Sequence, residues 1–294
     1  MTLEQLRIFV EVAERQHLTQ AAAVLALTPS AVSASIRVLE ERYGTPLFNR
    51  VGRRIETNEA GQIFLVEARA TLASARAAEL TLAELAGLKR GTLRIRASQT
   101  IASYWLPPLL VRFRQAYPLI DLDLAVGNTE QVAQTVLDGG ADLGFIEGHI
   151  DTPSLAVETI ADDRVVAVVA PGHPWAGGAP LKPARVLDSQ WIMRERGSGT
   201  RSAFEEMLRF AGVDPDTLDV ALTLPSNEAV RSAVLAGPYA AVVSELVVAA
   251  HIDAGLLCRA GIDLPPRAFY MLRHEARYKS RASLAMEALI RQVN

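Results

Sequence analysis

Two groups of polar residues in this sequence have types and spacings suited to binding negatively charged partners. The first lies on a predicted helix from Pro29 to Tyr43, where Ser30, Ser33 and Arg37 occupy the face opposite an apolar stripe. Short hydroxyls and one arginine can donate hydrogen bonds to bases and phosphates, and they leave room for the helix in the major groove of DNA. This face therefore indicates a nucleic-acid contact.

The second group surrounds the segment Gly197, Ser198, Gly199 and Thr200, which lies between a predicted strand ending at Arg194 and a helix. Small residues let backbone N–H groups point into a concavity, and a helix N-terminus adds partial positive charge, so the segment has the composition of an anion site. An ordinary flexible helix cap is the alternative, and the motif taken alone favours it.

Polar residues at other predicted strand and helix ends fall in the same region. Ser98, Gln99 and Thr100 follow the first strand of this part of the chain, where they can close on the same ligand. Glu147 ends a buried strand, and a carboxylate there would oppose a dianion. There are two alternatives for Glu147: it pairs with Arg194 or Arg196, or it selects a ligand that carries an ammonium group or a proton. The sequence leaves both open. Ser226 and Asn227 begin another helix, where they contact ligand or act as caps.

The helix from Pro29 is well marked and follows a shorter helix that begins at Leu18. Thr28 is a favourable N-cap, Pro29 suits the first helical position and Gly44 favours termination. A buried stripe at i, i+4 and i+7 spacing is formed by Val32, Ile36 and Leu39. These features predict a helix-turn-helix, with an amphipathic helix at Leu3 to Ala13 packed behind it.

A basic cluster follows the helix pair. Arg50, Arg53 and Arg54 precede the next acidic residue, Glu56. The net charge of −3 argues at first sight against a nucleic-acid partner, but a local cluster can bind phosphates whatever the charge of the whole chain. A solvated basic turn is the alternative, and the position directly behind a helix-turn-helix favours the phosphate role.

A short strand of a wing is predicted around Ile55 and Thr57, followed by the N-cap Asn58. A long helix then runs from Glu59 to about Leu88. Its apolar positions recur every three or four residues and favour pairing with a second chain, with packing on its own domain as the alternative; they include Phe64, Ala68, Leu72, Ala75, Leu82 and Leu85.

From Gly91 onward, segments of strand and helix character alternate, which predicts a mostly parallel sheet with a site at the strand ends. Two α/β lobes with a cleft between them fit this pattern, with crossings near Ala161 to Arg164 and Pro265 to Ala268. We predict a DNA-binding domain at 1–58, a linker and dimerisation helix at 59–90, and an effector-binding domain at 91–294. Within it, lobe I comprises 91–161 and 267–294, and lobe II comprises 162–266.

Composition excludes several other classes of protein. The 294 residues are 50% hydrophobic and 21% charged, as in an ordinary globular chain. No apolar run reaches the length of a membrane span, and the N-terminus carries acids where a secretory signal would be apolar, so we expect a cytoplasmic protein without membrane contact. The single Cys258 agrees with that compartment. We expect no enzyme, no metal and no cofactor, because no phosphate-binding P-loop is present and the five histidines lack metal-ligand spacing: His17, His149, His173, His251 and His274.

The N-terminal segment resembles the LysR-type transcriptional regulators. Their winged helix-turn-helix signature corresponds here to Phe9, Ala21, Ala22, Leu25, Ser30, Ala31, Val32, Ser33, Ile36, Leu39, Glu40, Gly44, Leu47, Phe48, Arg50, Ala60 and Gly61. Identities and spacing run together over some sixty residues, and the likeness extends over essentially the whole chain. Two departures are Ala34, where many members carry arginine, and Asn58, which follows Thr57 where a Leu-Thr pair is usual.

The resemblance implies a multidomain α and α/β protein: a winged helix-turn-helix, a linker helix and a two-lobed, periplasmic-binding-protein-like effector domain. It further implies that Ser30, Ser33 and Arg37 are candidates to contact base edges, with Arg37 able to reach either a guanine or a phosphate. Arg50, Arg53 and Arg54 would hold the flanking backbone, and Thr28 would bond a phosphate or, in the favoured role, cap its helix. Both Ser98–Thr100 and the GSGT segment would lie where the family binds its inducer.

The expected partners are double-stranded DNA, a small-molecule effector and further copies of the chain as a homodimer or homotetramer. The GSGTR form resembles regulators of sulfur assimilation or carbon fixation, which favours an oxyanion, a small carboxylate or a phosphorylated metabolite as co-inducer. A nucleoid-structuring protein without a ligand and a two-lobed α/β enzyme are the alternatives. Protection of a defined DNA site would separate a regulator from a structuring protein.

Overall fold

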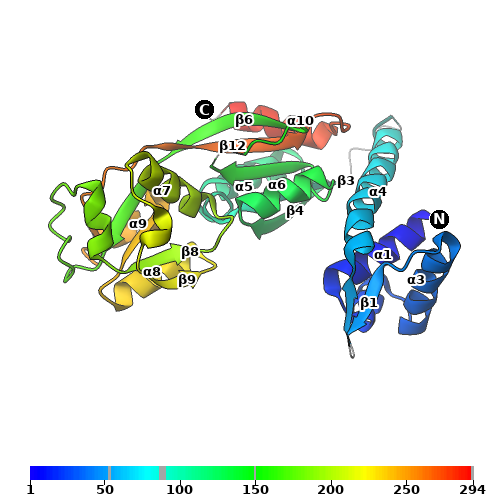
Figure 1. Cartoon of the computed structure of the whole chain (residues 1–294). Coiled ribbons are helices and arrows are strands. Elements are labelled where there is room, and N and C mark those ends of the chain that lie inside the picture. The colour runs from blue at the N-terminus through cyan, green and yellow to red at the C-terminus, as the bar shows by residue number, and fades with distance from the viewer. Residues whose placement is uncertain (52–53, 86–90, 149, 293–294) are drawn as a thin grey trace. The chain divides into compact units, whose positions relative to one another are not determined.

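The computed structural model describes residues 1–51, 54–85, 91–148 and 150–292, without the side chains of 50–51 and 83–85. The chain forms two compact units, Met1–Leu88 with Asp138–Gly140, and Lys89–Leu137 with Ala141–Asn294. Figure 1 shows both, coloured along the chain.

The first unit is a three-helix domain with a two-stranded hairpin. Its elements are α1 (Leu3–Arg15), α2 (Leu18–Leu25), α3 (Pro29–Tyr43), β1 (Phe48–Val51), β2 (Arg54–Thr57) and α4 (Glu59–Leu85). The turn between α2 and α3 passes through Ala26, which adopts a left-handed conformation with φ of 54°. The predicted helix-turn-helix and wing are thus present.

The core of this unit includes the first half of the long helix α4. Phe9 of α1 is fully buried, and its ring centroid lies 4.8 Å from that of Phe64 in α4. Ala68 is buried in the same cluster and Leu72 packs against it. Packing on its own domain therefore describes these three positions of α4 better than a pairing surface does. Leu82, another of the predicted pairing positions, is exposed, as are Ile63 and Val66, which were not predicted. The side chain of Leu85 lies outside the described residues.

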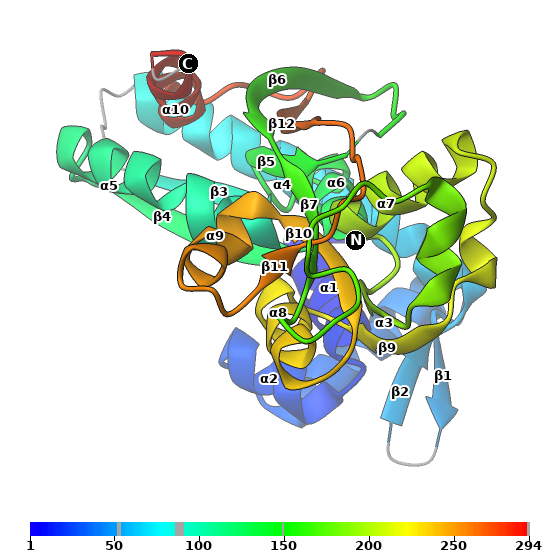
Figure 2. The same ribbon diagram turned by 90° about the vertical axis from the view of Figure 1, so that its left-hand side faces the viewer.

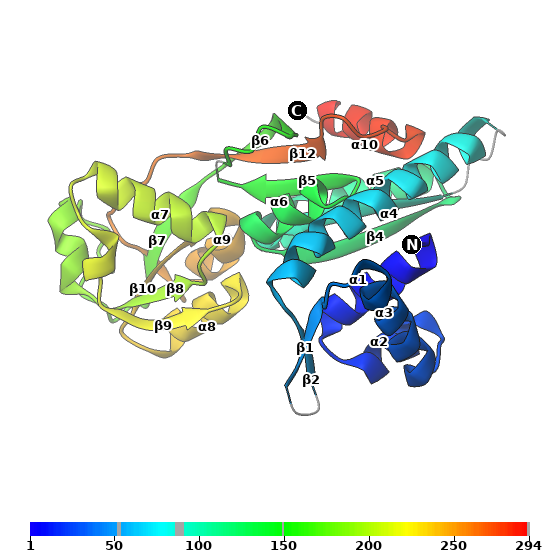
Figure 3. The ribbon, with the colours of Figure 1, turned by 45° about the vertical axis from the view of Figure 1, so that its right-hand side comes forward.

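The second unit contains two lobes, each built on a five-stranded sheet. In the first lobe the strand order is β4-β3-β5-β12-β6, from β3 (Gly91–Ser98), β4 (Ile120–Gly127), β5 (Leu143–Glu147), β6 (Leu155–Asp163) and β12 (Arg267–His274). Helices α5 (Pro107–Ala116) and α10 (Arg281–Arg291) share a core with the sheet, and α6 (Thr129–Leu137) covers its other side (Figure 3). A π-helical turn, Ile101–Trp105, follows β3.

In the second lobe the order is β11-β7-β10-β8-β9, from β7 (Val165–Val169), β8 (Trp191–Arg194), β9 (Val220–Leu224), β10 (Ala240–Ser244) and β11 (Cys258–Arg259). Helix α7 (Gly199–Phe210) packs on one side of this sheet (Figure 2). The other side is covered by α8 (Asn227–Ala236) and α9 (Glu245–Asp253). Two 3-10 helices, Pro183–Asp188 and Pro215–Thr217, complete the lobe.

The chain crosses between the lobes twice, after β6 and before β12. These crossings explain a departure from the predicted sheet. Strands β3, β4 and β5 are parallel, but β12 runs antiparallel to both β5 and β6 because it returns from the other lobe. Strand β10 likewise pairs antiparallel with β7 and parallel with β8. Both sheets are therefore mixed.

Among the described residues, no single helix has both the length and the apolar composition of a membrane span. In the part of the chain that the structure describes, one pair of helices, α2 and α3, meets the length and composition when taken together, and the two are bent by 105° from one another.

Candidate DNA-binding surface and effector site

Helix α3 buries one face and leaves the opposite face accessible. Val32, Ile36 and Leu39 are almost fully buried in the core of the first unit. Ser30 is exposed, Ser33 is half-buried, and the side chain of Arg37 is 70% exposed. Arg37 Nε lies 3.9 Å from Glu41 Oε1, one turn away on the same helix, which is too long for a hydrogen bond. The guanidinium is therefore available to a base or a phosphate.

The start of α3 is capped as its sequence predicts. The Oγ1 atom of Thr28 accepts a hydrogen bond of 3.2 Å from the backbone N–H of Ala31 and lies 3.0 Å from Ser30 Oγ. Gly44 ends the helix with φ of 62°. Thr28 thus has a structural role within the helix, and Ser30, the first exposed hydroxyl, is held beside it.

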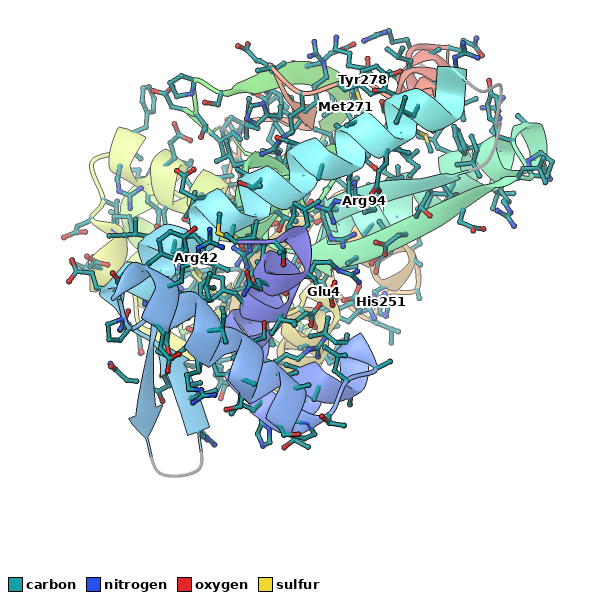
Figure 4. All side chains as sticks on the ribbon, turned by 90° about the vertical axis from the view of Figure 1, so that its right-hand side faces the viewer. Glu4, Arg42, Arg94, His251, Met271 and Tyr278 are labelled. Carbon is teal, nitrogen blue, oxygen red and sulfur yellow. The ribbon has the colours of Figure 1, made fainter. Side chains whose placement is uncertain are left out.

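The wing is the antiparallel hairpin of β1 and β2, in which Arg50 pairs with Ile55 and Val51 with Arg54. Arg54 is exposed. The side chain of Arg50 and the whole of Arg53 lie outside the described residues. Figure 4 shows the side chains of this unit, with Glu4 of α1 and Arg42 of α3 labelled.

In the second unit, the polar residues predicted to bind ligand converge where strand ends of the first lobe meet helix starts of the second. Ser98, Thr100 and Glu147 are buried and come from the ends of β3 and β5. From the second lobe come six further residues, of which all but Ser226 are buried: Arg194, Ser198, Gly199, Thr200, Ser226 and Asn227.

Glu147 is bonded to hydroxyl groups rather than to an arginine. Ser98 Oγ donates to its Oε2 atom, and Thr100 Oγ1 donates to its Oε1 atom at 3.2 Å. Complete burial raises the pKa of Glu147, and the positive charges of Arg267 and Arg194 offset this effect only in part. The Glu147 carboxyl group therefore takes up a proton more readily than an exposed glutamate does.

Arg194 is bonded to residues of its own lobe. Its Nε and Nη2 atoms donate to the carboxylate of Glu195 at 2.8 and 2.9 Å, and its Nη1 atom donates to Asn227 Oδ1 at 2.6 Å. The side-chain amide of Asn227 in turn donates to Thr100 Oγ1 at 3.0 Å. A continuous hydrogen-bonded chain thus crosses the interface from Arg194 of one lobe to Glu147 of the other.

The side chain of Gln99 forms hydrogen bonds with the first turn of α8. Its Oε1 atom accepts the backbone N–H of Asn227 at 2.6 Å, and its Nε2 atom donates to Glu228 at 2.7 Å. Tyr104 also donates to Glu228, at 3.0 Å. Ser226 caps the same helix by accepting the N–H of Ala229 at 3.0 Å. Capping, one of the two roles open for Ser226, is therefore observed.

The N-terminus of α7 is tightly packed and carries a polar atom without a partner. A methyl group on Gly199 would lie 2.0 Å from the carbonyl oxygen of Glu147, so a residue without a side chain is required there. Ser198, the residue before the helix, is 1% exposed, and its Oγ atom has no hydrogen-bond partner among the described atoms. An unpaired buried hydroxyl is costly, and a ligand at the helix N-terminus would satisfy it.

Two charged residues of this region were not predicted. Arg267 donates to Thr200 Oγ1 at 3.0 Å, and its Nε atom donates to Asp163 at 2.7 Å. Arg267 and Asp163 lie within the two segments predicted to cross between the lobes. That position in the sequence was the available signal that they contribute to this region. Among the described residues, no group of three or more His, Cys, Asp and Glu side chains is arranged to hold a metal ion.

The chain matches two family models along nearly its whole length. Residues 3–62 match the bacterial regulatory helix-turn-helix protein of the lysR family, and residues 86–294 match the LysR substrate-binding domain.

Relatives of similar length match this chain over nearly its whole sequence. The uncharacterised helix-turn-helix-type transcriptional regulator YeiE of Escherichia coli K12 is 36% identical over 284 residues, which cover 96% of this chain and 94% of that protein. A probable RuBisCO transcriptional regulator of Cyanidioschyzon merolae is 33% identical over 287 residues, covering 96% and 95%.

Among solved structures, the Synechocystis CcmR regulatory domain in complex with 2-PG is 28% identical. It covers 69% of this chain and 97% of its own, with a TM-score of 0.64. The helix-turn-helix corresponds to the first family match, and the two-lobed α/β unit corresponds to the second. The chain belongs to the LysR family and is a ligand-responsive, DNA-binding transcriptional regulator.

Proposed function

We propose that this regulator responds to a small oxyanion or small carboxylate bound at the N-terminus of α7. The observation that carries the proposal is Ser198 Oγ, a buried hydroxyl without a partner beside the first N–H groups of a 12-residue helix. Helix N-termini stabilise anions through these N–H groups and through the helix dipole. Thr200 and the buried guanidinium of Arg267 lie at the same turn.

Glu147 limits the kind of anion that this site accepts. A buried carboxylate facing an anion would be repelled, whereas a protonated carboxyl group can donate a hydrogen bond to it. Because burial raises the pKa of Glu147, its protonated form is more populated at a given pH than that of an exposed glutamate. We therefore infer that the effector binds together with a proton held by Glu147 or carried by the ligand itself.

On the DNA side, we propose that Ser30, Ser33 and Arg37 contact base edges and that Arg54 contacts the backbone. The accessible face of α3 and the exposure of Arg54 on the wing support these assignments. Within two chains related by a two-fold axis, two such helices would contact the two halves of a pseudo-palindrome.

We infer domain limits of 1–58 for the DNA-binding domain, 59–90 for the linker helix and 91–294 for the effector domain. The first half of α4 also belongs to the core of the DNA-binding unit. We further infer that the site between the lobes binds its ligand without catalysis, since its polar side chains form a hydrogen-bonded network and the matched family is one of regulatory proteins.

A thermal-shift screen of the full chain tests the effector class. The compounds are sulfite, sulfate, thiosulfate, phosphate, small carboxylates and sugar phosphates, with neutral and cationic metabolites beside them. A true effector at 100 times its Kd should add about 2.7 kcal/mol to the free energy of unfolding.

Two matched variants locate the bound anion. Ser198→Ala should reduce the shift, and Ser202→Ala, an exposed hydroxyl one turn later on the same helix, should leave it unchanged. A shift produced by neutral or cationic metabolites alone would overturn the anion assignment.

Footprinting on the DNA upstream of a neighbouring gene should show a protected site rather than uniform coverage.

A further inference from the structure

A buried ion pair joins the two crossings between the lobes. Asp163 is the last residue of β6 and Arg267 is the first residue of β12, and the two are directly opposed in the antiparallel register. Arg267 Nη2 lies 2.6 Å from Asp163 Oδ2, and the two side chains are 6% and 1% exposed. A desolvated pair of this kind requires good geometry and additional hydrogen bonds to be stable.

Those additional bonds come from the second lobe. Ser244 Oγ donates to Asp163 Oδ1 at 2.6 Å, and Ser244 also caps α9 by accepting the N–H of Leu246 at 3.2 Å. Arg267 Nη1 donates to Thr200 Oγ1 at 3.0 Å, in the first turn of α7. The ion pair on the crossings is therefore bonded to two separate elements of the second lobe.

We name Asp163, Arg267, Thr200 and Ser244 the hinge clamp. Hydrogen bonds weaken steeply with distance and angle, so a rotation of the second lobe about its crossings must break at least one bond of the clamp. Each broken bond would leave a buried polar group unsatisfied, which opposes small, graded rotations.

We propose that the hinge clamp fixes the angle between the lobes, and that Arg267 is the positioning residue linking that angle to the first turn of α7. The link to the effector rests on the proposed function, because Thr200 belongs to the proposed anion site. An anion that displaces the Thr200 hydroxyl then acts directly on the residue that holds the hinge. The fixing of the angle is independent of any ligand.

The test measures the distance between the lobes in the full chain without effector. In a Cys258→Ser background, spin labels are placed at Ser232→Cys on α8 and Ala288→Cys on α10, both exposed positions. Labelled protein is mixed with excess unlabelled protein so that each oligomer carries one labelled copy, and distances are measured by pulsed electron resonance.

The chain without clamp variants should give one narrow distance distribution. Arg267→Met, which keeps an unbranched apolar side chain and removes the guanidinium, should broaden or shift it by several ångström. Arg273→Met is the matched control, since Arg273 lies on the same strand and its acidic neighbour, Glu287 at 3.9 Å, belongs to the same lobe. Identical distributions for Arg267→Met and the unsubstituted chain would overturn the proposal.

If Arg267→Met does not fold, Thr200→Val removes the hydrogen bond from Arg267 to Thr200, and Ser244→Ala removes the hydrogen bond from Ser244 to Asp163. Both variants leave the ion pair intact. Each should broaden the distribution, and unchanged distributions for both would again refute the clamp. Because no effector is added, failure of the anion screen would reject the proposed effector class without affecting this result.

Discussion

Replacing Gly199 with alanine should force the first turn of α7 away from the end of β5. The added methyl group would lie 2.0 Å from the carbonyl oxygen of Glu147 and 2.7 Å from Thr129 Oγ1. The distance between a Cβ atom and a heavy atom that is not bonded to it essentially never falls below 3.0 Å in real structures. The nearer of the two atoms, Glu147 O, belongs to the backbone and cannot rotate away as a side chain can. The two segments must therefore separate by about 1 Å, since a packed interior has no free space to absorb a methyl group.

The magnitude follows from the cost of overpacking, about 1 to 3 kcal/mol. For a unit of this size, that loss lowers the Tm by about 2 to 12 °C. The displaced N–H groups are those proposed to bind the anion, so effector affinity should fall about tenfold or more, as expected for a loss of at least 1.4 kcal/mol.

The assay is thermal unfolding of the full chain followed by anion titration. The control is Gly172→Ala, the same substitution at an exposed position in the same lobe where no atom lies within 4 Å. If both variants unfold within about 1 °C of one another, α7 is not held against β5 as described, and the reasoning about the anion site fails with it.

Three further predictions concern the DNA-binding unit and Glu147. Arg54→Ala should weaken binding to all DNA sequences alike and reduce the slope of log K against log salt by about 0.9 for each phosphate that is no longer neutralised; Arg164→Ala, an exposed arginine of the effector unit, should not. Thr28→Ala should cost the DNA-binding unit about 1 kcal/mol in chemical denaturation, and Thr28→Asn, which can still cap, should recover most of it. Because burial raises the pKa of Glu147 above its ordinary 4.5, its contribution to stability is present below that value and is lost as pH rises through the folded-state pKa. Anion affinity should fall over the same pH window, and Glu147→Gln should remove both dependences; an unchanged pH profile in this variant would assign them to another group.

Local signals in the sequence were sufficient for α3. Its cap, its apolar stripe and its terminating Gly44 each depend on residues within one helix, and each is observed. The convergence of Ser98 and Glu147 also followed from the sequence, because the carboxyl ends of parallel strands meet at one edge of a sheet.

Non-local pairing could not be predicted in the same way. Arg267 follows two prolines at a crossing, and nothing near it in the sequence indicates that Asp163, 104 residues earlier, is its partner. The bonds made by Gln99 are another example, since both partners lie on a helix of the other lobe. These contacts depend on how two lobes meet, which no local periodicity encodes.

The long helix shows a different limit. Phe64 and Ala68 have the spacing of a pairing surface, and the same spacing serves equally well for packing against α1. Apolar periodicity indicates that a helix face is covered but does not identify what covers it.

The burial of Phe64 and Ala68 has a mechanical consequence. Because the first turns of α4 share a core with α1 and α3, we expect a movement of α4 to be transmitted to the DNA-binding unit. Its 27 residues extend about 40 Å at 1.5 Å per residue. By geometry, a sideways displacement of about 4 Å at the far end tilts α3 by about 6°. Small movements at one end of α4 would thus change the orientation of α3, without altering any of its side chains.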